Sequence, residues 1–126
     1  MPLPKKIFTR KDEITSDFLQ LIDQHINDLL QSRVNKRFHA SHFAEQLFIH
    51  PRHLTNTLKL TTGKSPCDIV EERIIAEVIR LLNENQLSIA EIGFKFAYED
   101  PTNFTKFFKG MTDTTPLQFR KNNLIQ

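Results

Sequence analysis

The stretch Leu87–Arg120, LSIAEIGFKFAYEDPTNFTKFFKGMTDTTPLQFR, contains the start and end signals of three helices. Ser88, with Glu91 three residues later, forms a capping box that marks a helix start. Asp100–Pro101 and Thr115–Pro116 each place a capping residue directly before a proline, and such a pair commonly opens a helix. The stretch therefore predicts two short helices joined by a tight turn, with a third helix after them.

The second of these helices has one apolar face and one polar face. Phe104, Phe107 and Phe108 recur at three- and four-residue steps, which predicts a buried stripe. Its other face carries hydrogen-bonding and cationic side chains: Thr102, Asn103, Thr105, Lys106 and Lys109. Two short helices of which the second is polar on its outer face are typical of a helix-turn-helix, whose second helix enters the major groove of DNA.

An earlier part of the chain repeats this pattern. Two pairs of a capping residue and a proline coincide at a shift of fifty positions: His50–Pro51 with Asp100–Pro101, and Ser65–Pro66 with Thr115–Pro116. Upstream of them, Ala44–Glu45 matches Ala90–Glu91 at a shift four residues shorter. We therefore expect two helix-turn-helix units, and we expect the first helix of the second unit to be about one turn longer.

The remaining residues divide the chain into four expected segments. Residues 1–14, with two prolines and four basic residues, are expected to form a flexible basic arm. Residues 15–65 would hold a long helix from 15 or 16 to about 32 and the first unit, whose first helix covers about 40–48. Residues 66–84 would form a linker helix, and residues 85–126 the second unit and a C-terminal helix. No alternating strand pattern occurs, so the chain is predicted to be all-α.

The charged residues are distributed unevenly, although the formal net charge is only +2. Residues 51–64 and 101–112 contain lysine or arginine and no carboxylate, whereas residues 66–84 contain five carboxylates and two arginines. A helix that enters a groove lined by phosphates is expected to exclude carboxylates. A linker of about seventeen residues spans roughly 25 Å, so one chain can place its two second helices in consecutive grooves about 34 Å apart.

Two sets of side chains on these elements have the chemistry that DNA binding requires. Arg52 can donate two hydrogen bonds to guanine, Asn56 and Asn103 can pair with adenine, and Lys106 can reach guanine or a phosphate. Thr55, Thr102 and Thr105 can exchange hydrogen bonds with bases or pack on thymine methyl groups. Cations and helix N-termini bind phosphates, which predicts phosphate contacts at Lys59, Lys64, Ser65, Ser88, Lys109, Thr115, Arg120 and Lys121.

Residues 17–121 resemble the DNA-binding domain of the AraC/XylS family of bacterial transcription regulators. The most specific similarity is SIAEIGFKFAYEDPTNFTKFFKGMTDTTPLQFRK, and FAEQLFIHPRHLTNTLKLTTGKSP resembles the first helix-turn-helix of the family. The resemblance implies seven helices, with recognition helices at about 51–60 and 101–110. It implies base contacts by Arg52, Thr55 and Asn56 in the first unit and by Pro101, Thr102, Thr105 and Lys106 in the second.

This chain departs from the family pattern at several positions. Ala97–Tyr98 stands where the family usually has Gly-Phe, Asp113 replaces a glycine, and an aromatic residue common at position 103 is Asn103. In the first unit, Asn56 replaces a frequent arginine, so a different base preference is expected there.

The sequence gives little support to functions other than DNA binding. The five histidines and the single Cys67 do not suggest a closed zinc site, and no nucleophile–base arrangement or phosphate loop is present. We therefore expect no metal, no cofactor and no enzymatic activity. One cysteine and no apolar run long enough to span a bilayer favour a cytoplasmic protein. A helical protein-interaction module that holds RNA polymerase or another regulator is the main alternative, and a small-molecule sensor is the second.

The expected partners are double-stranded DNA and RNA polymerase, with the chain acting as a monomer. The chain is either a stand-alone regulator or the C-terminal fragment of a longer one.

Overall fold

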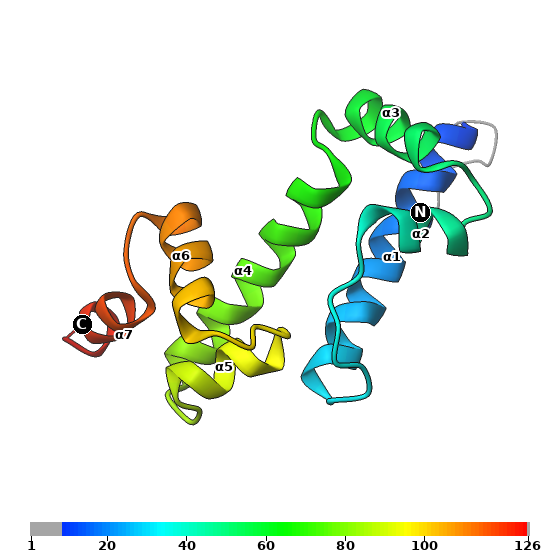
Figure 1. Ribbon diagram of the computed structural model, residues 1–126. Helices are drawn as coiled ribbons and strands as arrows, with labels where there is room; N and C mark the ends of the chain where they lie inside the picture. Colours follow the sequence, from blue (N-terminus) through cyan, green and yellow to red (C-terminus); the bar gives the residue numbers. More distant parts are fainter. Residues whose placement is uncertain (1–8, 126) are drawn as a thin grey trace, which may run out of the picture. The chain divides into compact units, whose positions relative to one another are not determined.

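The computed structural model describes residues 9–125, with side chains through residue 122, and contains seven α-helices and no strand over that range. The helices are α1 (Arg10–Leu30), α2 (Ala40–Gln46), α3 (Pro51–Thr62), α4 (Pro66–Glu84), α5 (Ile89–Lys95), α6 (Pro101–Thr112) and α7 (Pro116–Ile125), as Figure 1 shows. The all-α fold with seven helices is confirmed for the part of the chain described. Helix α4 has the bounds predicted for the linker helix.

The predicted capping residues begin their helices. The Ser88 Oγ accepts a hydrogen bond from the Glu91 N–H, and Glu91 Oε1 accepts one from the Ser88 N–H, both at 3.1 Å. The bonds from Ser88 hold the pKa of the Glu91 carboxyl below its ordinary value. Asp100 Oδ1 accepts from the Thr102 N–H at 2.8 Å, and Thr115 Oγ1 accepts from the Gln118 N–H at 3.1 Å. The capping residues predicted from the sequence therefore determine where α5, α6 and α7 begin.

Helix α1 begins earlier than predicted. Thr9 Oγ1 accepts a hydrogen bond from the Asp12 N–H at 3.2 Å, and Asp12 Oδ2 accepts one from the Thr9 N–H at 3.1 Å. This reciprocal cap starts the helix at Arg10, and Ile14 is only 1% exposed. The prediction of a flexible arm over 1–14 is therefore wrong for residues 10–14, and residues 1–8 lie outside the described residues.

The contacts divide the chain into two compact units, and two of the three boundaries between them fall inside helices. The first unit combines the described residues up to His25 with Phe38–Glu71, and the second combines Ile26–Arg37 with the chain from Glu72 onward. Helices α1 and α4 each pass from one unit into the other. The end of α1 and the connector after it thus belong with the second helix-turn-helix, although the sequence had grouped them with the first.

The two helix-turn-helix motifs match each other more closely than the sequence indicated. Helices α2 and α5 each contain seven residues, so the expectation of an extra turn in the second unit is wrong. The Ile49 N–H donates to the Ala44 carbonyl at 3.1 Å, and the Tyr98 N–H donates to the Gly93 carbonyl at 3.0 Å. These equivalent bonds pair positions 49 residues apart. The one additional residue therefore lies in the turn before α6, and the Ala-Glu match was coincidental.

Each unit has its own apolar core. Fully or nearly fully buried side chains of the first unit are Ile14, Phe18, Ile22, Phe43, Ala44, Leu54, Leu58 and Ile69. Those of the second are Ile26, Leu29, Ile74, Val78, Leu81, Leu82, Ile92, Phe96, Tyr98, Phe104 and Phe108. Phe94 was predicted to be buried, but it is 57% exposed because it lies two residues from both Ile92 and Phe96 and so on the opposite side of α5. Phe107 and Phe119, also predicted as core, are half-buried.

Six described residues use the left-handed backbone region, and four of them belong to the two helix-turn-helix motifs. Gly63 and Asp113 end α3 and α6 with φ of 78° and 66°, and Phe48 and Ala97 occupy the turns inside the two motifs with φ of 59° and 66°. A side chain with a Cβ is strained in this region by about 1–2 kcal/mol, less so for aspartate. Ala97 therefore carries strain that a glycine would not.

We expect Ala97→Gly to raise the free energy of unfolding by about 0.5–1 kcal/mol, because relief of the backbone strain exceeds the added entropy of the unfolded chain. Ala90→Gly is the matched control, since Ala90 lies exposed within α5. That change should lower the free energy of unfolding by about 1 kcal/mol. Chemical denaturation of the two variants checks the prediction, and a loss of stability in Ala97→Gly would contradict it.

Candidate nucleic-acid interface

Helix α3 presents an apolar face to its own unit and a polar face to solvent. His50 Nδ1 accepts a hydrogen bond from the Arg52 N–H at 3.0 Å, which caps the helix before Pro51. Leu54, Thr57 and Leu58 are buried. On the other side of the helix, Arg52, Asn56 and Lys59 are exposed.

The exposed side chains of α3 are not engaged within the protein. No hydrogen bond or ion pair to the Arg52 guanidinium, the Asn56 amide or the Lys59 ammonium is found among residues 9–122. Thr55 differs, because its hydroxyl donates to the Pro51 carbonyl at 3.1 Å. With its proton used inside the helix, Thr55 offers lone pairs and a methyl group to a ligand. Arg52 and Asn56 retain their full donor sets.

Helix α6 repeats this arrangement in the second unit. Phe104 and Phe108 are buried, while Pro101, Thr102, Asn103, Lys106 and Lys109 are exposed and Thr105 is half-buried. No carboxylate occurs between Pro101 and Thr112. The cap before the helix is anionic here, since Asp100 takes the place that His50 has in the first unit. Each unit thus brings its predicted base-contact residues onto one exposed helix.

The three hydroxyls predicted to touch phosphates all cap helices, and their surroundings differ. Ser65 Oγ accepts from the Asp68 N–H at 3.1 Å, so a carboxylate stands in the first turn of α4. Ser88 has the Glu91 carboxylate on its own N–H. Thr115 is bound in return by the neutral Gln118 side chain, and α7 has no acidic residue in its first turn. Of the three N-termini, that of α7 is electrostatically best suited to an anion.

Lys64, Arg120 and Lys121 were also predicted as phosphate ligands, and Arg120 has an internal role. Arg120 Nε donates to the Leu82 carbonyl at 3.2 Å, near the C-terminal end of α4. Arginine at this place satisfies carbonyls left free by the helix end. Only the remaining N–H groups of Arg120 are left for a phosphate. Lys64 and Lys121 are exposed.

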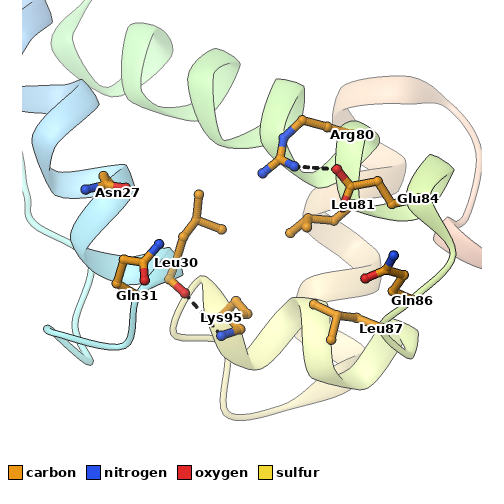
Figure 2. A pocket seen from close by; sticks show the side chains of 9 residues that line it. All are labelled: Asn27, Leu30, Gln31, Arg80, Leu81, Glu84, Gln86, Leu87 and Lys95. Carbon is orange, nitrogen blue, oxygen red and sulfur yellow. Dashed lines mark hydrogen bonds and ion pairs between the residues drawn. The ribbon is translucent and has the colours of Figure 1, made fainter.

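A surface cavity of about 400 Å³ lies in the second unit, and none of the residues that line it belongs to α3 or α6. It is lined by Asn27, Leu30, Gln31, Arg80, Leu81, Glu84, Gln86, Leu87 and Lys95. Figure 2 shows Arg80 bonded to Glu84 and Lys95 directed at the Leu30 carbonyl. Glu77 also binds the Arg80 guanidinium at 2.8 Å, and these contacts raise its pKa. The two cations that line the cavity, Arg80 and Lys95, are thus already bound within the protein. The cavity lining contains no residue predicted to contact DNA.

Most of the histidines have structural surroundings. His25 is 3% exposed, its Nε2 accepts the Phe38 N–H at 3.0 Å, and its ring stacks on Phe38 at 4.1 Å. His42 Nδ1 accepts the N–H of His39 at the start of α2. Within residues 9–125, no group of three histidine, cysteine or acidic side chains is arranged to hold a metal ion. No helix in this range is long and apolar enough to cross a membrane.

Comparison with known proteins identifies the family. A family model described as a helix-turn-helix domain matches residues 43–122, which is more than half of the chain. The chain is 25% identical over 109 residues to the arabinose operon regulatory protein of Salmonella typhimurium, covering 86% of this chain and 36% of that protein. The chain belongs to the AraC/XylS family. It is also 30% identical over 73 residues to the probable transcription factor PqrA of Proteus vulgaris, covering 58% of this chain and 60% of PqrA.

A solved structure of a DNA-binding domain shares the fold. The DNA-binding domain of AdpA, determined in complex with a target DNA, superimposes with a TM-score of 0.70 at 15% identity. The match covers 84% of this AraC/XylS chain and 91% of the AdpA domain. The chain spans 8%, 48% and 60% of the lengths of three curated relatives that it matches.

Proposed function

We propose that this AraC/XylS chain is a transcription regulator that binds a specific double-stranded DNA site through α3 and α6. The observation that carries the proposal is the pair of exposed polar faces at equivalent positions of two motifs. Neither face contains a carboxylate, and their arginine, asparagine and lysine side chains have no partner among residues 9–122. Desolvating such groups is favourable only against complementary ligands, and DNA supplies both base edges and phosphates.

The proposal divides the side chains by the part of DNA that they meet. Arg52, Thr55 and Asn56 would read bases in one major-groove segment, and Pro101, Thr102, Thr105 and Lys106 would read the next. Phosphates would be bound by Lys59, Lys64, Lys109, Lys121 and the N-terminus of α7, with weaker contributions near Ser65, Ser88 and Arg120. Since one chain carries two reading helices, we propose that it binds as a monomer. The assigned role is binding rather than catalysis, and RNA polymerase is the proposed protein partner.

We expect Lys109→Ala to weaken binding to preferred and unrelated duplexes by the same factor. Lys109 is an exposed cation in the last turn of α6, beyond the base-reading positions. Loss of one phosphate contact should reduce the slope of log affinity against log salt by about one unit. Fluorescence anisotropy with two duplexes across a salt series measures both effects. A loss confined to the preferred duplex would contradict the assignment of Lys109 to phosphate.

A protein-interaction module is the second candidate, and exposed apolar side chains favour it. Phe48 is 95% exposed in the turn between α2 and α3, and Leu60 is 70% exposed on α3. Exposed large apolar residues can mark a protein contact. This candidate predicts no salt-dependent affinity for duplex DNA, so the same salt series separates the two functions.

A further inference from the structure

The connector between α1 and α2 contacts the turn of the second helix-turn-helix. Arg37 Nη1 donates to the Tyr98 hydroxyl at 2.8 Å, and the guanidinium carbon lies 4.0 Å from the centre of the Tyr98 ring. Arg37 and Tyr98 are 61 residues apart in sequence but belong to the same unit. Arginine can stack on an aromatic face and donate a hydrogen bond at once because its donors form a rigid plane.

Tyr98 transmits this contact to the second recognition helix. Its ring stacks on Phe107 and meets Phe104 at a tilt, with both pairs of ring centres 5.5 Å apart. Both phenylalanines belong to α6. Tyr98 also follows the strained Ala97, and a backbone in that region persists only where neighbouring contacts hold it. The buried Tyr98 ring is such a contact.

A second hydrogen bond joins the end of α1, just before this connector, to α5. Lys95 Nζ donates to the Leu30 carbonyl at 3.1 Å, at the C-terminal end of α1 (Figure 2). Lys95 therefore joins the end of α1 to the last residue of α5, and Arg37 joins the connector to the turn that follows α5. The equivalent residue of the first unit is Ile49, which has neither a hydroxyl group nor an aromatic ring, so the contact of Arg37 with Tyr98 has no counterpart there.

We propose that Arg37 is a positioning residue for the second recognition helix: it fixes Tyr98, and through Tyr98 the part of α6 that carries Phe104 and Phe107. The role in DNA reading rests on the proposed function, whereas the effect on the turn does not. The alternative is that Arg37 is simply a phosphate ligand in the basic connector. Lys36 offers the matched control, because it is an exposed neighbouring cation without a contact of this kind.

Amide hydrogen exchange of the free protein tests the positioning role without DNA. The Tyr98 N–H, bonded to the Gly93 carbonyl, reports on the turn, and the equivalent Ile49 N–H, bonded to the Ala44 carbonyl, is the internal reference. Arg37→Ala should speed exchange at Tyr98 by about tenfold, equivalent to 1.4 kcal/mol, and leave Ile49 unchanged. Lys36→Ala should change neither. Unchanged exchange at Tyr98, or an equal rise at Ile49, would overturn the proposal.

A double-mutant cycle then separates positioning from phosphate binding. Tyr98→Phe removes the acceptor hydroxyl while the charge of Arg37 remains. If Arg37 positions α6, either single change should lower discrimination in the duplex segment read by α6 by roughly three- to tenfold, and the double variant should lose little more. Discrimination in the α3 segment should stay constant. If Arg37 is a phosphate ligand, Tyr98→Phe has no effect and Arg37→Ala weakens all duplexes alike. Absence of any duplex preference in the wild type would refute the proposed function, while the exchange result would still decide the role of Arg37.

Discussion

Gly93→Ala is expected to lower the free energy of unfolding by about 1–3 kcal/mol, the usual range for an overpacked core. A Cβ at Gly93 would lie 3.1 Å from Cγ and Cδ2 of Phe104, closer than ordinary van der Waals contact. Phe104 is 1% exposed and cannot turn outward without leaving the core of the second unit. Gly110→Ala is the matched control, since nothing lies within 4 Å of its added Cβ. It should raise the free energy of unfolding by about 0.5–1 kcal/mol, because alanine is the better helix former.

The first unit indicates how Gly93→Ala can be rescued. At the positions equivalent to Gly93 and Phe104 it has Ala44 and Leu54, both fully buried. The first unit thus combines the larger Ala44 on α2 with the smaller Leu54 on α3, whereas the second unit combines Gly93 on α5 with Phe104 on α6. The double variant with Gly93→Ala and Phe104→Leu should therefore lose less free energy of unfolding than the sum of the two single variants. The expected coupling energy is about 1 kcal/mol. Urea denaturation of all four proteins measures it, and strict additivity would show that the Gly93–Phe104 contact is not the cause.

Arg52→Ala is expected to reduce discrimination at one base position of the preferred site by about 1–3 kcal/mol, the range for a bidentate contact with guanine. The Arg52 guanidinium is exposed near the start of α3, and only its backbone N–H is used, by His50. The free side chain can therefore reach a base edge without breaking an internal contact. Competition binding against duplexes substituted one base pair at a time measures the loss.

Lys59→Ala is the control for charge, because Lys59 is an exposed cation in the last turn of the same helix. It should weaken all duplexes by a similar factor while keeping the base preference. Unchanged affinity and base preference in Arg52→Ala would refute the assignment of Arg52. A uniform loss in both variants would make Arg52 a phosphate ligand.

The sequence predicted features that depend on neighbours along the chain. Ser88 with Glu91 and Asp100 before Pro101 set helix starts through bonds that span only a few residues. Gly63 adopted the left-handed turn that its missing side chain favours. The start of α1 was not predicted, although Thr9 and Asp12 cap it. These two residues lie in an N-terminal stretch with two prolines and four basic residues, a composition that suggested a mobile arm. The family was also correctly identified from the order and spacing of these local features.

Other features depend on contacts between distant residues and could not be predicted. Nothing near Arg120 in the sequence indicates that it binds the Leu82 carbonyl, 38 residues away. The bond of Arg37 to Tyr98 and the close approach of Gly93 to Phe104 likewise require the helices to be packed. The residues of the candidate site could be predicted from the sequence, because their spacing within α3 and within α6 already places them on one face of each helix. Which of them touch DNA stays a prediction.

We propose that α3 and α6 read two segments of one DNA site. Selection of bound duplexes from a random pool tests it most directly, performed with the wild-type protein and with the variants Arg52→Ala and Lys106→Ala. We predict an enriched motif with two parts about one helical turn apart. Arg52→Ala should blur one part and Lys106→Ala the other. Enrichment of no motif, or blurring of the same part by both variants, would contradict the account.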